Sequence, residues 1–361
     1  MSNRYYRPAP ITIDEINADW LTAALRTYAP DVTVRGFEIV DAMRSTCTKL
    51  RLRLVVDEAG KRAGIPETVI LKGGFEPHSR NLYYMHEKEV RAYRDVMPVL
   101  NLPCPKPYFA DYDPDQKQGI IIMEDLVASG ATFCSALKPQ TFEQVARRLT
   151  LLAQFHAKTW GSPEFRNGGD WAWADDILAN QRLHFDQYLE PDVWQRFICS
   201  SRGAAASIRF HDRNWMISAL DAIASLSKTL PHAMIHGDTH LGNLYIGPDG
   251  MPGFFDSVTG RAPPLLEIAY HLGCALDTGD RARWEGALIQ HYLDELARQG
   301  AAPLAFDEAW RQYGAMLAYG YCVFIINEPF FQAEAINTAY VARFSAAMLD
   351  HDTIGLLKSV S

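Results

Sequence analysis

The chain of 361 residues is 48% hydrophobic and 22% charged, an ordinary globular balance that excludes an intrinsically disordered protein. Its formal net charge of −8 argues against binding to the phosphate backbone of nucleic acids and mildly favours cationic substrates. No apolar run approaches the length that a membrane span needs, so we expect no membrane partner.

The six cysteines are scattered and include no Cys-x-x-Cys pair. In a chain of this size they are typical of reduced, mostly buried thiols. The first residues lack the apolar core of a signal peptide. We therefore expect a cytoplasmic protein, long enough for one large two-lobed enzyme or for two ordinary domains.

The first part of the chain predicts a short helix followed by strands. A capping box at residues 12–15 begins an amphipathic helix that we expect to end near Pro30. Residues 49–56 alternate apolar and basic side chains, which predicts a strand with one buried face. A turn is expected at residues 57–60, and a further strand at residues 68–72.

A helix is predicted from Asn81 to Met97, and its apolar face carries one acidic residue, Glu89. A carboxylate on a buried face needs a cation, and Lys72, at the end of an apolar strand, is its natural partner. Glu87 falls on the wetter face beside Arg91, where surface ion pairs are expected. The sequence therefore predicts a partly buried Lys72–Glu89 ion pair.

The composition changes after a buried strand predicted at residues 119–123. A short polar connection, Glu124-Asp125-Leu126, follows that strand, and we expect its acidic side chains in solvent. From Thr141 onward the pattern is that of long helices. We place the boundary here, with an N-terminal lobe at residues 1–126 and a C-terminal lobe at residues 127–361.

The stretch His-Gly-Asp-Thr-His-Leu-Gly-Asn, residues 236–243, carries the strongest chemical signal. Asn243 follows Asp238 by the spacing of the protein-kinase catalytic loop, and Asp256 comes after a predicted hairpin. Phosphoryl transfer needs a carboxylate at the attacking hydroxyl, and an amide oxygen and a second carboxylate for Mg²⁺. We expect the hairpin to bring Asp256 beside Asn243.

This stretch, with the apolar strand ending in Asp256, resembles the aminoglycoside phosphotransferase and choline kinase-like families. The segment Leu-Ala-Gln-Phe-His-Ala-x-x-Trp at residues 152–160 resembles their ecdysteroid-kinase-like branch. The resemblance implies an α+β, protein-kinase-like two-lobed fold. Its small lobe would have an antiparallel sheet with one helix packed on it, and its larger lobe would be mainly helical.

The resemblance also implies roles for the motif residues. Asp238 would orient and deprotonate the acceptor hydroxyl, and Asn243 and Asp256 would hold Mg²⁺. Lys72, positioned by Glu89, would hold the α- and β-phosphates of ATP.

The resemblance implies two further contacts to the nucleotide. Adenine would bond to the backbone carbonyl of Glu124 and the backbone amide of Leu126. The loop expected over the phosphates has no glycine, so the hydroxyls of Ser45 and Thr46 would serve in place of a backbone cradle. A plain polar hairpin turn remains the alternative for this loop.

Several histidines surround the predicted catalytic loop. His156 is expected to be a hydrogen-bonded core residue beneath the loop, and His236 to support the loop through hydrogen bonds. His240 has two open roles, a structural one or an approach to the γ-phosphate. In the segment after Asp256, Glu267 stands where the related families usually have aspartate.

We read the chain as an ATP-dependent kinase of a small-molecule hydroxyl, with an aminoglycoside-, choline-, macrolide- or steroid-like acceptor. One alternative is a nucleotide-binding pseudokinase, which the glycine-free loop would suit. Another is a zinc hydrolase that uses the His-x-Asp-x-His segment, but this would give no role to Asn243 and Asp256. The sequence does not distinguish the acceptors or indicate an oligomeric state.

Overall fold

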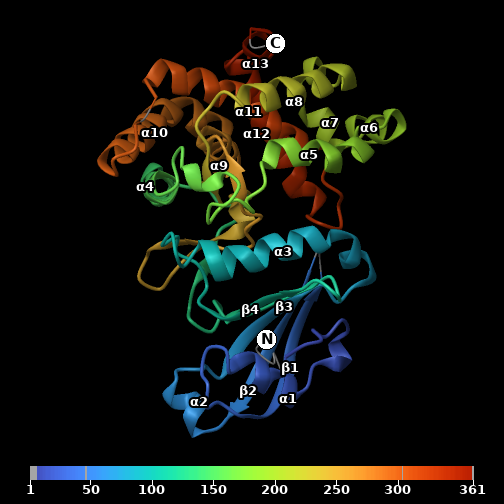
Figure 1. The fold of residues 1–361 in the computed structure, drawn as a ribbon. Helices are drawn as coiled ribbons and strands as arrows, with labels where there is room; N and C mark the ends of the chain where they lie inside the picture. Colours follow the sequence, from blue (N-terminus) through green and yellow to red (C-terminus); the bar gives the residue numbers. More distant parts are fainter. Residues whose placement is uncertain (1–5, 45–46, 303, 360–361) are drawn as a thin grey trace. The chain divides into compact units, whose positions relative to one another are not determined.

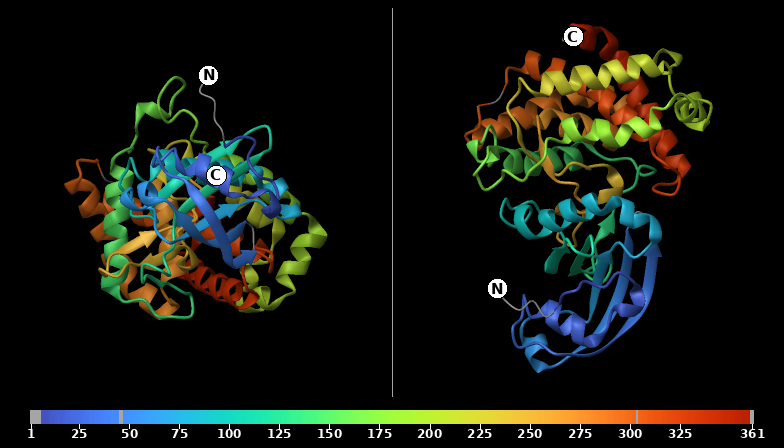
Figure 2. Two further views of the ribbon diagram at one scale, coloured as in Figure 1. Left: turned by 90° about the horizontal axis from the view of Figure 1, so that it is seen from below. Right: turned by 45° about the vertical axis from the view of Figure 1, so that its right-hand side comes forward.

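The computed structural model describes residues 6–44, 47–302 and 304–359. The chain forms two compact units, one of Met1–Phe133 with Tyr245–Val258 and one of Cys134–Leu244 with Thr259–Ser361. The predicted α+β class is confirmed, because the first unit is built on an antiparallel sheet and the second is mainly helical (Figures 1 and 2). The lobe boundary after residue 126 stays a prediction, whereas the compact units divide after Phe133.

The first unit contains a five-stranded antiparallel sheet in the order β1-β2-β3-β5-β4. Its strands are β1 (Val34–Arg44), β2 (Thr48–Val56), β3 (Thr68–Gly73), β4 (Pro107–Asp113) and β5 (Gln118–Glu124). The strand predicted from alternating residues is β2, where Leu50 and Leu52 are buried. Lys49 lies directly opposite Lys72 of β3, so both lysines project from the other face.

The two faces of this sheet have different partners. Helix α1 (Ala18–Leu25) contributes Trp20 and Leu21 to the apolar core that Leu50 and Leu52 share. Helix α3 (Tyr83–Arg91) runs along the sheet, as Figure 1 shows, and packs against β5. The approach is close at Gly119, where a Cβ atom would lie 2.9 Å from the backbone oxygen of His86. Glycine therefore lets α3 pack against β5.

Two predicted local structures differ in detail. The capping box at Thr12 is present, but it caps only a 3₁₀ turn, Ile13–Glu15. Helix α1 begins afterwards, because the side chain of Asn17 accepts a hydrogen bond from the Trp20 amide at 2.9 Å. The turn expected at residues 57–60 is instead helix α2 (Glu58–Arg62), because the Asp57 carboxylate accepts from the Gly60 amide.

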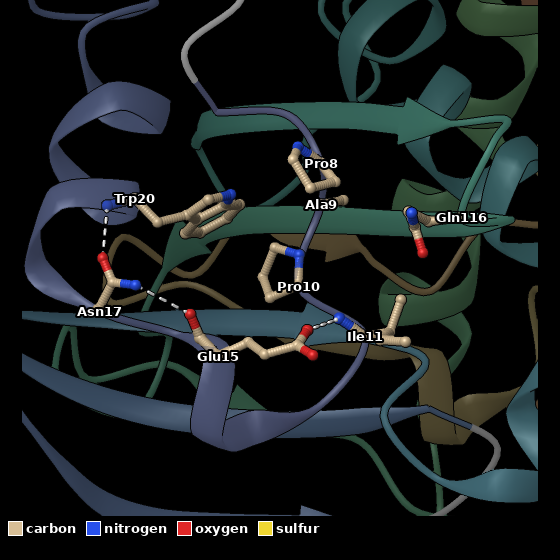
Figure 3. Close-up of a pocket in the computed structure, with 8 residues that line it drawn as sticks. All are labelled: Pro8, Ala9, Pro10, Ile11, Glu15, Asn17, Trp20 and Gln116. Atoms are coloured by element: carbon tan, nitrogen blue, oxygen red, sulfur yellow. Dashed lines mark hydrogen bonds between the residues drawn. The ribbon is translucent and has the colours of Figure 1, made fainter.

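A hollow of about 300 Å³ lies beside this N-terminal cap, and Figure 3 shows its lining. The carboxylate of Glu15 accepts a hydrogen bond from the Ile11 amide, and the amide of Asn17 donates to the Glu15 carbonyl. None of the predicted site residues lines this hollow. The lining residues are Pro8, Ala9, Pro10, Ile11, Glu15, Asn17, Trp20 and Gln116.

A second, three-stranded sheet contains the predicted hairpin. Its order is β6 (Thr132–Phe133), β8 (Leu244–Ile246) and β9 (Pro252–Phe254). The turn between β8 and β9 is closed by a hydrogen bond of 2.8 Å from the Gly247 amide to the Met251 carbonyl. The hairpin is therefore confirmed, and Asp256 follows it with a left-handed φ of 57°.

The second unit consists mainly of helices. They are α4 (Phe142–Ala157), α5 (Ile177–Phe185), α6 (Pro191–Ile198), α7 (Ser201–Ala205), α8 (Arg213–Ser227), α9 (Pro264–Ala275), α10 (Thr278–Arg298), α11 (Phe306–Ile326), α12 (Glu334–Asp350) and α13 (Thr353–Lys358). Two short strands, β7 (Ala233–Ile235) and β10 (Gly260–Ala262), pair antiparallel. Every residue of α9 is buried, so this helix lies at the centre of the unit (Figure 1). Within the described part of the chain, no helix combines the length and the apolar character needed to cross a membrane.

Candidate active site

The predicted ion pair between strand β3 and helix α3 is present. The ammonium of Lys72 lies 2.5 Å from the Glu89 carboxylate, and both side chains are more than 90% buried. Glu87 instead forms an exposed pair with Arg91 at 2.9 Å, one helical turn away. The choice of Glu89 over Glu87 is therefore confirmed, and the reason is the one predicted, the apolar face on which Glu89 lies.

Asp256 completes this group of charges within the first unit. Its Oδ1 lies 3.0 Å from the Lys72 ammonium, and its Oδ2 lies 2.5 Å from the ammonium of Lys49. Sequence reasoning missed Lys49. The signal was available, because the alternation along residues 49–56 places Lys49 on the same face as Lys72 once strands β2 and β3 pair in this register.

The buried charges set one another's protonation. Burial alone would raise the pKa of Asp256, but the charges of Lys49 and Lys72 outweigh it and hold the pKa below its usual value. Burial would likewise lower the pKa of Lys72, and the carboxylates of Asp256 and Glu89 raise it instead. Asp256 is therefore an anion between two ammonium groups.

The loop between β1 and β2 is described only in part. Ser45 and Thr46, the predicted phosphate-binding hydroxyls, lie outside the described residues. On one side of them, Arg44 lies 3.1 Å from the carboxylate of Glu76. On the other side Thr48 is buried, and its hydroxyl donates to the same carboxylate at 3.5 Å. Glu76 therefore contacts one residue on each side of Ser45 and Thr46.

The adenine contacts expected at the connection after β5 stay a prediction. The hydrogen bonds formed here involve the Glu124 amide, which donates to Lys106, and the Leu126 carbonyl, which accepts from Ala131. Adenine was expected to use the other backbone group of each residue, the Glu124 carbonyl and the Leu126 amide. Glu124 and Leu126 also help to line a hollow of about 270 Å³ in the first unit.

Asp125 is not solvated as expected. Its side chain is buried and lies 2.9 Å from the guanidinium of Arg51 on strand β2. The position of this carboxylate depends on strand pairing, which the local sequence does not reveal. Asp125 therefore joins the connection to the sheet.

In the second unit the catalytic-loop motif forms a compact group. The side-chain amide of Asn243 donates to the Asp238 carbonyl at 3.0 Å and to its carboxylate Oδ2 at 2.9 Å. Because the amide nitrogen is used in these bonds, the amide oxygen is the atom left to face a cation. Asn243 belongs to the second unit and Asp256 to the first, and their joint metal site stays a prediction.

A tyrosine that sequence reasoning missed also holds Asp238. The hydroxyl of Tyr270, on helix α9, donates to Asp238 Oδ1 at 2.8 Å. The ring of Tyr270 stacks on Phe324 with 5.4 Å between centroids. Nothing in the local sequence of α9 marks Tyr270, because its role depends on where the helix packs.

His240 lies beside this carboxylate without a close bond to it. Its Nε2 is 3.7 Å from Asp238 Oδ2, and its Nδ1 accepts a hydrogen bond from the Gly242 amide at 3.0 Å. The Gly242 bond closes the turn that contains Asn243. His240 thus has a structural contact, and its approach to a γ-phosphate stays a prediction.

Glu267 of helix α9 supports the start of the loop. Its carboxylate accepts hydrogen bonds from the amides of His236 at 3.1 Å and Gly237 at 2.7 Å, and from His156 Nε2 at 2.9 Å. His156 is fully buried, and its Nδ1 bonds to the hydroxyl of Tyr292. The predicted core role of His156 is confirmed, and Glu267 is the residue through which it reaches the loop.

The zinc-site alternative finds no cluster in the structure. Across residues 6–44, 47–302 and 304–359, no group of three His, Cys, Asp or Glu side chains could hold a metal ion. In the His-x-Asp-x-His segment, His236 Nδ1 accepts a hydrogen bond of 3.3 Å from the Asp238 amide. His236 therefore has the loop-supporting contact that was predicted.

Comparisons with known proteins bear on the family and the fold of the chain. A family model described as "Phosphotransferase enzyme family" matches residues 83–305, more than half of the chain. That match does not resolve the ecdysteroid-kinase-like branch, which stays a prediction. No curated protein is similar enough in sequence to match the chain.

Solved structures that share the fold include a choline kinase and an amicoumacin kinase. Choline kinase LicA from Streptococcus pneumoniae is 13% identical, with a TM-score of 0.50 over 90% of this chain and 94% of that one. Amicoumacin kinase hAmiN, solved in complex with AMP-PNP, Ca²⁺ and Ami, is 14% identical, with a TM-score of 0.52 over 87% and 88%. The predicted protein-kinase-like fold is confirmed. The chain belongs to the phosphotransferase enzyme family.

Proposed function

We propose that the protein transfers the γ-phosphate of ATP to a hydroxyl group of a small molecule. The observation that carries this proposal is the buried chain of contacts Glu89–Lys72–Asp256 in the first unit. Burying such charges is costly, and a purely structural role would be served as well by apolar side chains. Together with the family match, these contacts support a site that binds phosphate and metal.

The roles of the chain's own residues follow from their surroundings. Lys72, fixed by Glu89, would bind the α- and β-phosphates. Asp238 would accept the proton of the acceptor hydroxyl, because its carboxylate is oriented by Tyr270 and Asn243. The Glu124 carbonyl and the Leu126 amide would bind adenine.

Asn243 and Asp256 would hold Mg²⁺. The donor set fits this ion, since an amide oxygen and a carboxylate are hard oxygen ligands. The lysines beside Asp256 keep it ionised, as a metal ligand must be. When bound, the metal would neutralise negative charge on the phosphates during transfer.

The acceptor is a hydroxylated small molecule in this proposal, of the aminoglycoside, choline, macrolide or steroid type. Two of the solved structures that share the fold are named as choline and amicoumacin kinases, which supports a small-molecule acceptor and not a protein. The net charge of −8 favours a cationic acceptor among these. A kinase needs ATP, which suits the cytoplasmic location expected from the cysteine pattern.

The proposal is tested by incubating the protein with MgATP and a library of hydroxylated metabolites, with mass detection of an added phosphate. We expect one or a few library members to gain a phosphate, and Asp238→Asn to abolish the gain. MgATP binding without transfer to any library member, and without ATP consumption, would instead support the pseudokinase. Absence of nucleotide binding would refute both.

A further inference from the structure

Two lysines share one carboxylate in the first unit, and among the described residues only Lys72 has a second carboxylate partner. Lys72 contacts Glu89 at 2.5 Å and Asp256 at 3.0 Å, whereas Lys49 forms its ion pair, within the described part of the chain, with Asp256 at 2.5 Å. Lys49 and Lys72 are directly opposite each other on paired strands. Like charges in that position repel, so Asp256 stabilises the pair in this state.

The other basic residues on this face of β2 have carboxylate partners of their own. Arg51 lies 2.9 Å from Asp125, and Arg53 lies 2.6 Å from Glu38. Neither acid belongs to the proposed metal site. Lys49 differs, because its partner is the carboxylate that would be given to Mg²⁺.

The charge balance of this group would change if Asp256 bound a metal ion. Lys49, Lys72, Glu89 and Asp256 sum to zero as they stand. Once Asp256 binds a divalent cation, the two lysines face only Glu89, and one positive charge is left over next to the metal. An anion is needed there, and the phosphates of a nucleotide are the anion that the proposed function supplies.

The strand turn next to Lys49 explains why such a contact is useful. Residues 43–48 contain no glycine, so this loop lacks the residues that let a backbone approach phosphates closely. A lysine has a compact charge on a flexible stem of four carbons and can reach a phosphate from the strand. The Lys49 side chain is 23% exposed, whereas Lys72 is 7% exposed. Lys49 is thus the more solvent-accessible of the two cations.

We propose that Lys49 is a second phosphate-binding lysine, which leaves Asp256 when the metal binds and contacts the phosphate chain of the nucleotide beside Lys72. The inference rests on the proposed function and extends it. In this inference the Lys49 side chain makes a phosphate contact that the backbone of a glycine-rich loop would otherwise make.

The test is equilibrium binding of ATP, ADP and adenosine, each with Mg²⁺, to the full chain. Lys49→Met should weaken ATP and ADP binding by about 10–100-fold and leave adenosine within about twofold. Lys49→Arg should keep most of the ATP affinity, because it keeps the charge. Arg53→Met is the matched control, on the same strand and face, and should bind all three as the wild type does.

The outcomes separate the inference from the proposed function. If Lys49 only neutralises Asp256, Lys49→Met should bind MgATP as well as the wild type or more tightly, and the inference is wrong. An equal loss for adenosine would also overturn it, since the effect would not depend on phosphate. If the wild type binds no nucleotide, the proposed function fails and the inference with it. Should the methionine variant not fold by circular dichroism, Lys49→Gln gives the same readout.

Discussion

The substitution Glu267→Gln tests how the catalytic loop is held. The Glu267 carboxylate accepts three hydrogen bonds, from the amides of His236 and Gly237 and from His156 Nε2. Glutamine keeps the shape but has one acceptor oxygen in place of two, and its amide group would face donors. At least one buried N–H would lose its acceptor.

The expected magnitude follows from the burial of this group. Hydrogen bonds to a charged acceptor contribute about 1.5–3 kcal/mol each, and a buried donor left without a partner costs about 1–3 kcal/mol. Because the three bonds share one carboxylate, their effects do not add. We expect Glu267→Gln to lower the free energy of unfolding by about 2–4 kcal/mol at neutral pH.

The pH dependence gives a second prediction for the same variant. Burial opposes ionisation of Glu267, but His156, His236 and the Gly237 amide outweigh it, so its folded-state pKa lies below its ordinary value. A lowered folded-state pKa stabilises the protein above the unfolded pKa of about 4.3, and the contribution is lost as the pH falls through the folded pKa. The difference between wild type and variant should therefore be constant near neutral pH and shrink in acid.

Urea unfolding measures both effects through the fluorescence of the eight tryptophans. Glu285→Gln is the control, because Glu285 is also buried and accepts from Arg281, Tyr313 and His351, away from the loop. It should lose stability while keeping phosphate transfer below its unfolding midpoint, whereas Glu267→Gln should lose both. A stability loss under about 0.5 kcal/mol for Glu267→Gln would refute the reasoning.

Three further predictions concern the proposed chemistry. Asp238→Asn should keep MgATP binding and lose about 10²–10⁴-fold in transfer rate, whereas Asp256→Ala should lose both. MgATP titration followed by a turnover assay measures both properties, and the reversed pattern would show that the two roles are exchanged. Tyr270→Phe should lower kcat about 10-fold with unchanged MgATP affinity, and an unchanged kcat would contradict a positioning role. Lys72→Ala should abolish MgATP binding and also lower the thermal midpoint, because Glu89 would lose its buried cation; retained binding would contradict the assignment.

The sequence predicted those parts of the site that depend on local pattern and charge. Glu89 could be chosen because helical periodicity places it on an apolar face, where it needs a cation. The loop from Asp238 to Asn243 could be chosen because its spacing is fixed by the chemistry. The strands β2, β3 and β5 followed from alternation and from continuous apolar runs.

The residues that were missed depend on tertiary placement. Lys49 acquires its role only from the pairing of β2 with β3 and from the return of the chain to Asp256. Tyr270 lies on a helix that is buried on every side, so periodicity does not mark the face that meets the loop. Helix α2 was read as a turn, because the Asp57 side chain that caps it is also an ordinary turn residue.

The surroundings of the two aspartates support different chemistry for each. Asp256 lies between the ammonium groups of Lys49 and Lys72, which favour its ionised form. The two cations disfavour protonation of this carboxylate and keep it ionised, as a metal ligand must be and a proton acceptor must not remain. Asp238 accepts hydrogen bonds from two neutral groups, the Tyr270 hydroxyl and the Asn243 amide, which orient it without compensating its charge. A carboxylate held in that way can take the proton of a hydroxyl, and exchanging the two roles would place the base where protonation is least favourable.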